Sequence, residues 1–132
     1  MTPEDTVNAF IAAVTSGDRD GAAALVAEDL VYENIGFGPT SLDEALPTMN
    51  GATAMLDFLA PMQDADWTVH RQHQFGQVVV NERTDRFTSG GTRIELPVAG
   101  IFEVVDGRIT YWRDYFDATL MNQQLSAGSE PG

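Results

Sequence analysis

The sequence contains no cysteine and no lysine. Without cysteine the chain cannot form disulfides, use a thiol nucleophile or bind a metal through thiolates. Its seven basic residues are all arginines and stand against 20 acidic residues, so the formal net charge is −13. A field of this sign repels phosphate backbones and anionic lipids, which argues against binding to nucleic acid or to a membrane surface. No apolar run approaches the roughly 20 residues that a membrane-spanning helix needs.

The remaining composition is that of one ordinary globular domain. The chain has 132 residues, of which 43% are hydrophobic and 20% are charged, enough for one core and one pocket. We expect a single domain over residues 1–125 and a disordered tail over residues 126–132, which are rich in Ser and Gly. The first residues lack the basic and apolar regions of a signal peptide, so we expect a cytoplasmic protein.

Helical signals come first along the chain and strand signals follow. Thr2, Pro3 and Asp5 are typical of a helix start, because they supply a cap, a first-turn proline and a negative charge. Further helices are expected up to about Ala27 and over residues 51–62, with a short strand at 30–35 and an irregular loop at 36–50. The predicted later strands are Trp67–Phe75, Gln77–Thr88, Thr92–Val105 and Arg108–Asp117, before a helical turn at 118–125. This order predicts an α+β fold with helices on one face of a curved antiparallel sheet.

Two of these strands carry charged residues where a core could form. Alternation puts Arg83 and Asp85 on one face of their strand, and it places Asp114 between Trp112 and Phe116. An inward-facing Asp114 would be partly desolvated, which raises the pKa of its carboxyl group. A three-residue loop at 89–91 and a two-residue turn at 106–107 would bring all three charged residues to one face. A two-residue Gly90-Gly91 turn would reverse this, and Pro97 predicts a bulge in the middle strand.

The residues alone leave the meaning of these charges open. An Arg and an Asp two positions apart on a strand are usually solvent-exposed, whereas an inward cluster of two carboxyl groups and an arginine is suited to acid–base chemistry. His70 and His73 are expected on opposite strand faces, which disfavours a histidine metal site. No phosphate-binding loop, dinucleotide fingerprint or zinc-protease motif is present.

Three motifs together resemble the limonene-1,2-epoxide hydrolase family. They are Tyr32-Glu33-Asn34, Asn81-Glu82-Arg83-Thr84-Asp85 and Trp112-Arg113-Asp114-Tyr115-Phe116-Asp117. The resemblance implies the cone-shaped fold of the nuclear transport factor 2, ketosteroid isomerase and SnoaL-like polyketide cyclase group, also called cystatin-like, with three or four helices. It also implies epoxide hydrolysis without cofactor, metal or covalent intermediate, with Asp114 as general base and Asp85 as general acid. Arg83 would then bridge the two aspartates, and Tyr32 and Asn34 would position the water.

Aromatic and aliphatic residues near these motifs suggest a pocket for a small to medium apolar epoxide. The expected lining residues are Phe37, Phe58, Leu59, Met62, Leu96, Val98, Trp112 and Phe116. Two other functions stay open: proton transfer, as in steroid isomerisation or polyketide cyclisation, and ligand binding without catalysis. Val78 and Val80 would lie on the outer face of the sheet, so we expect a homodimer that covers them.

Overall fold

The computed structural model describes residues 1–37 and 48–129 of the chain. The helices are α1 (Pro3–Thr15), α2 (Arg19–Ala23), α4 (Ala52–Leu59) and α5 (Ala118–Ser129). The strands are β1 (Val26–Phe37), β2 (Met49–Asn50), β3 (Gln63–Phe75), β4 (Val78–Ser89), β5 (Thr92–Val105) and β6 (Arg108–Asp117). Within these ranges no helix is long and apolar enough to cross a bilayer.

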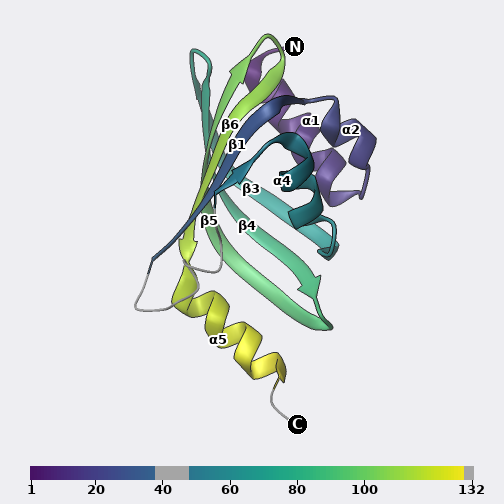
Figure 1. Cartoon of the computed structure of the whole chain (residues 1–132). Helices are drawn as coiled ribbons and strands as arrows, with labels where there is room; N and C mark the ends of the chain where they lie inside the picture. The colour runs from purple at the N-terminus through teal and green to yellow at the C-terminus, as the bar shows by residue number, and fades with distance from the viewer. Residues whose placement is uncertain (38–47, 130–132) are drawn as a thin grey trace.

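The strands form one curved six-stranded sheet in the order β2-β1-β6-β5-β4-β3. Helices α1, α2 and α4 lie on one face of it, and α5 leaves its lower end (Figure 1). The predicted α+β architecture is therefore confirmed, but the sheet is not wholly antiparallel, because β1 pairs with β6 in parallel. Hairpin turns identify only pairings between consecutive strands, so they carry no signal for the parallel pairing of β1 with β6.

The predicted start of α1 is confirmed. The Thr2 side chain accepts a hydrogen bond from the Asp5 backbone, and the Asp5 side chain accepts one from the Thr2 backbone. This reciprocal arrangement satisfies two backbone donors that would otherwise lack partners at the helix end. The predicted ends of other elements differ. Helix α2 stops at Ala23 rather than near Ala27, and β1 is longer than the expected strand at 30–35.

The loop expected over residues 36–50 is only partly described. Its first two residues continue β1 and its last two form β2, while residues 38–47 lie outside the described residues. At the other end of the chain, α5 continues to Ser129 instead of giving way to a disordered tail at Ser126. Two contacts fix this helix. Asp117 accepts a hydrogen bond from the Leu120 backbone, and Gln124 exchanges two hydrogen bonds with the backbone of Glu95 on β5. Composition does not reveal such contacts.

The register of the meander differs from the expected one by one residue at two places. Ser89 pairs with Thr92 across a two-residue Gly90-Gly91 turn, so Asp85 faces Leu96 rather than Glu95. A bulge near Glu103 then shifts β6, so Asp114 faces Gly100 rather than Ala99. The two shifts cancel, because each reverses the face of the sheet. Arg83, Asp85 and Asp114 therefore do share the inner face.

Pro97 does not cause the bulge that we expected in the middle strand. It pairs with Thr84 within an unbroken β4–β5 ladder. The pairing of β5 with β6 begins only at the next residue, Val98. Pro97 therefore lies where β5 has one described neighbour, a position that tolerates a missing backbone N–H.

Candidate active site

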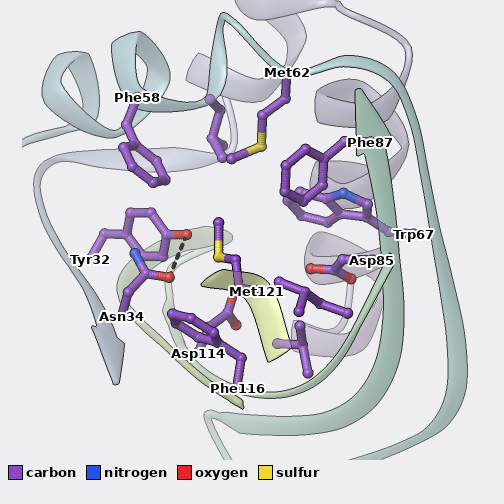
Figure 2. Close-up of a pocket in the computed structure, with 13 residues that line it drawn as sticks. Tyr32, Asn34, Phe58, Met62, Trp67, Asp85, Phe87, Asp114, Phe116 and Met121 are labelled. Carbon is purple, nitrogen blue, oxygen red and sulfur yellow. Dashed lines mark hydrogen bonds between the residues drawn. The ribbon is translucent and has the colours of Figure 1, made fainter. Parts of the chain in front are cut away.

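A pocket opens between the inner face of the sheet, helix α4 and the start of α5 (Figure 2). Its empty space, mouth included, is about 460 Å³. The lining is mostly apolar, with two carboxyl groups, one phenol and one amide among the side chains. The lining residues are Tyr32, Asn34, Phe58, Leu59, Met62, Trp67, Asp85, Phe87, Leu96, Val98, Asp114, Phe116 and Met121.

Arg83 joins the two aspartates at the base of this pocket. Its Nε and Nη2 atoms donate to the two carboxylate oxygens of Asp85, each at 2.9 Å. The same Nη2 atom donates to Oδ2 of Asp114, also at 2.9 Å. The arginine side chain is fully buried, and those of Asp85 and Asp114 are 8% and 6% exposed. Such short, charge-assisted contacts fix the positions of both carboxyl groups.

Burial and charge act in opposite directions on these groups. Burial is the main cause that raises the pKa of Asp114, and the charge of Asp85 adds to it, while Arg83 and Trp112 oppose the rise. Burial alone would lower the pKa of Arg83, but Asp114 and Asp85 outweigh it, so this pKa is raised and the guanidinium stays charged. One fixed positive charge therefore serves two acidic groups, an arrangement that favours holding a proton in the cluster.

We expected Trp112 to line the pocket, but it does not. Its side chain lies in the core and contacts Asp114. Its indole N–H donates to Oδ1 of Asp114 at 2.7 Å. The ring is completely buried, stacked on Tyr32 at 4.0 Å between ring centroids and edge-on to Phe10 at 5.3 Å. The aromatic core thus fixes the orientation of the carboxyl group that faces the pocket.

Tyr32 and Asn34 lie beside Asp114 because β1 runs parallel to β6. In that ladder Tyr32 pairs with Trp112, and Asn34 pairs with Asp114. The Tyr32 hydroxyl donates to Oδ1 of Asn34 at 3.2 Å (Figure 2). The Nδ2 atom of Asn34 is buried and has no hydrogen-bond partner among the described residues. Burial raises the pKa of Tyr32 well above its ordinary value, so the phenol remains neutral. The structure thus brings together all five polar residues that the sequence singled out.

Six of the eight expected apolar residues line the pocket: Phe58, Leu59, Met62, Leu96, Val98 and Phe116. The two exceptions are Trp112 and Phe37. Phe37 is 58% exposed and stacks on Tyr115. The sequence reasoning missed Trp67, Phe87 and Met121. Phe87 shares its strand alternation with Asp85, which was a usable signal, but the other two depend on the β3–β4 register and on the docking of α5.

We expected the two histidines on opposite faces of their strand, but they lie on the same face. A register shift between Val69 and Arg71 changes the alternation of β3. His70 contacts Thr84 at 2.7 Å, and His73 lines a shallow groove with Val80, so both lie on the outer face. Among residues 1–37 and 48–129, no three acidic or histidine side chains are grouped so that they could hold a metal ion.

Gly100 provides the space in which the charged cluster lies. It faces Asn81 on β4 and Asp114 on β6. A Cβ atom at this position would overlap Nη1 of Arg83 and lie 2.9 Å from Oδ1 of Asp114. A glycine inside a strand often marks such a close approach, so a signal for this residue was present in the sequence.

The site combines two carboxyl groups joined by an arginine with a phenol and an amide, all beside an apolar cavity on an α+β fold. Side chains of these types are suited to acid–base chemistry. The sequence matches the family model of the limonene-1,2-epoxide hydrolase catalytic domain over residues 1–126. The chain belongs to the limonene-1,2-epoxide hydrolase family, and its class of enzyme is accordingly an epoxide hydrolase.

Known proteins agree with this assignment. The chain is 38% identical over 125 residues to epoxide hydrolase EphG of Mycobacterium tuberculosis. The matched region covers 92% of this chain and 78% of the relative. A solved structure of a limonene-epoxide-hydrolase-like enzyme from M. tuberculosis matches with a TM-score of 0.76 and 38% identity, over 94% of this chain and 89% of that one. A Catenulispora acidiphila protein with a ketosteroid isomerase-like fold matches at 21% identity and a TM-score of 0.75, over 99% of this chain and 96% of that one, which shows the fold alone.

The contact at Gly100 yields a test of the cluster. We expect Gly100→Ala to push the Arg83 guanidinium out of place, because the new methyl group meets atoms of both charged partners. Activity should fall at least tenfold, and the free energy of unfolding should fall by about 1–3 kcal/mol, as for other overpacked interiors. Kinetics and urea unfolding measure the two effects. Ala99→Gly, next along β5 on the outer face, is the control and should keep activity. Full activity in Gly100→Ala would show that the cluster does not need this spacing.

Proposed function

We propose that the protein opens a small to medium apolar epoxide to a vicinal diol in one step, by direct attack of water. The observation that carries the proposal is the buried Asp85–Arg83–Asp114 bridge beside Tyr32 and Asn34. Opening an epoxide in an apolar pocket requires a nucleophile at carbon and a proton at oxygen. The pair of aspartates supplies both functions, and the proposed reaction uses only water and these side chains.

Asp114 is the base in this scheme. Its Oδ1 and Oδ2 atoms accept hydrogen bonds from Trp112 and Arg83, and the group lines the pocket next to Asn34. Water held by Tyr32 and Asn34 gives a proton to Asp114 while its oxygen bonds to an oxirane carbon. The free Nδ2 of Asn34 is a donor for the oxygen of this water.

Asp85 is the acid. As the bond from carbon to the oxirane oxygen breaks, Asp85 gives its proton to that oxygen, so no alkoxide is left in the apolar pocket. Afterwards Asp114 carries a proton and Asp85 does not, and one proton must pass back through solvent before the next cycle. Arg83 contacts both groups and keeps them in place while the charge moves from one to the other.

We further propose that a second copy of the chain covers the outer face of the sheet. A shallow groove there is lined by the apolar or aromatic residues Val80, Ala99, Ile101 and Tyr115, together with Arg71, His73 and Glu82. An apolar strip of this kind favours association with a like surface.

Substituting the two aspartates tests the assigned roles. We expect Asp114→Asn and Asp85→Asn each to lower kcat/KM by about 10²–10⁴, because each removes one partner of the proton transfer. Diol formation from a panel of terpene, cyclic and aryl epoxides measures this. Asp66→Asn makes the same chemical change at an exposed side chain of β3 and should leave activity intact. Wild-type activity in either of the first two variants would remove that residue from the mechanism.

The pH dependence follows from the environment of Asp114. The base works only when ionised, and burial raises its pKa above the ordinary value of 3.8. The acid side of the kcat/KM profile should therefore lie above pH 3.8. The Trp112 hydrogen bond lowers this pKa, so Trp112→Phe should move the acid side to higher pH. Profiles from about pH 4 to pH 9 measure the shift. An acid side that stays in place or moves to lower pH would contradict the role of Asp114.

The dimer proposal is tested by measuring mass in solution. Light scattering after size-exclusion chromatography should give twice the chain mass of 14.3 kDa. Ile101→Asp should convert the protein to a monomer, because a charge would then lie in the apolar strip. Asp57→Asn, on helix α4 away from that face, is the control. A monomeric wild-type protein would refute the proposal.

A further inference from the structure

Trp67 lines the pocket and carries a buried hydrogen-bond donor that has no partner among the described residues. The donor is the indole Nε1 atom, and the residue is only 9% exposed. An indole N–H can only donate, so its partner must be an acceptor. Buried polar groups in native proteins nearly always have partners, and an unpaired one inside a ligand site points to the ligand.

The position of Trp67 in the sheet indicates which acceptor it meets. Trp67 on β3 is the direct cross-strand partner of Asp85 on β4. Both lie on the side of the pocket opposite Tyr32 and Asn34, and the indole extends between Phe87 and Asp85 (Figure 2). The ring also lies over the Arg83 guanidinium, whose carbon is 5.2 Å from the ring centroid. Trp67 is thus held next to the acid and away from the water-positioning residues.

We propose that the Trp67 indole N–H donates a second hydrogen bond to the oxirane oxygen, beside the proton donated by Asp85. This inference rests on the proposed function, which puts that oxygen next to Asp85. The oxygen has two lone pairs, so it can accept from both groups. Negative charge grows on it as its bond to carbon breaks, and a fixed donor in a dry site stabilises the charge without having to reorient. Trp67 thereby becomes a catalytic residue of this chain.

The first test observes the N–H itself. The chain has two tryptophans, so a ¹⁵N-labelled sample gives two indole signals, assigned with Trp67→Phe. Asp114→Asn, which is expected to bind epoxides without turnover, is titrated with styrene oxide, cyclohexene oxide and limonene-1,2-epoxide. The matched ligands are the cyclopropane analogues, in which CH₂ replaces the oxirane oxygen. We expect the Trp67 proton signal to move downfield with an epoxide and not with its analogue. Equal effects of the two, or no shift with any epoxide, would overturn the proposal.

The second test removes only the N–H. Incorporation of 3-benzothienylalanine at position 67 replaces the N–H by sulfur and keeps the ring size. We expect kcat to fall roughly tenfold, the loss for one hydrogen bond to a developing charge. The same analogue at Phe75, an exposed residue of β3, controls for the incorporation and should leave kcat unchanged. Thermal unfolding should not change at either position, so a loss of kcat reports on chemistry rather than folding.

A pair of epoxides that share one carbon skeleton and differ by one ether oxygen identifies the atom that accepts the hydrogen bond from Trp67. If the N–H bonds to the oxirane oxygen, the loss of kcat is the same for both. A loss confined to the ether-bearing epoxide, or no loss at all, would overturn the proposal. Failure of the proposed function looks different: the wild type would then form no diol from any epoxide. In that case the indole shift still decides whether Trp67 binds an oxirane oxygen.

Discussion

The structure depends on one buried guanidinium that is shared by two carboxyl groups. Arg83 is fully buried and donates to Asp85 and Asp114 over distances of 2.9 Å. Taking three ionisable groups out of water costs much free energy, and removing one partner of such a cluster typically costs about 3–5 kcal/mol. A cluster of this kind is therefore weak evidence for stability, but it fixes the positions of two carboxyl groups beside the pocket. The proposed epoxide opening needs an acid and a base at fixed positions, and in that proposal the cluster supplies both at this cost in free energy.

The fold meets this constraint through features outside the polar residues. Gly100 leaves the volume that the guanidinium and the Asp114 carboxyl group occupy. The parallel pairing of β1 with β6 brings Tyr32 and Asn34 beside Asp114, although they lie about 80 positions earlier in the chain. Trp112 stacks between Tyr32 and Phe102 and donates to Asp114. The aromatic core and the Tyr32–Asn34 pair thus together support the carboxyl group of Asp114.

Much of the site could be predicted because its residues occur in short, ordered motifs. Asp114 between two aromatic residues is unusual on a strand, and Arg83 and Asp85 share one strand face whatever the register is. The strand register that brings these motifs together could not be predicted. The two-residue Gly90-Gly91 turn and the bulge near Glu103 each shift the register by one residue, and only their combination keeps the cluster on the inner face. Local turn signals do not report on such compensation.

The errors in the predicted pocket have the same origin. Trp112 was expected in the lining because alternation assigns it to the inner face, but Tyr32 stacks over it and separates it from the cavity. Trp67 was missed because its position opposite Asp85 depends on the register shift between Val69 and Arg71, for which the sequence offers no local signal. Met121 enters from α5, whose Gln124 side chain accepts a hydrogen bond from the Glu95 backbone N–H of β5 and donates one to the Glu95 carbonyl. Alternation along a strand gives the face, whereas depth within the core is decided by neighbours that are distant in sequence.

In the proposed reaction the two aspartates act through water and never bond to the substrate. A single turnover in ¹⁸O-water with enzyme in excess over epoxide tests it most directly. Direct attack puts one ¹⁸O atom into the diol in the first turnover and leaves the carboxyl groups of the protein unlabelled. An unlabelled first diol, with ¹⁸O appearing later in Asp114 or Asp85, would show a covalent ester intermediate and rule out direct attack of water.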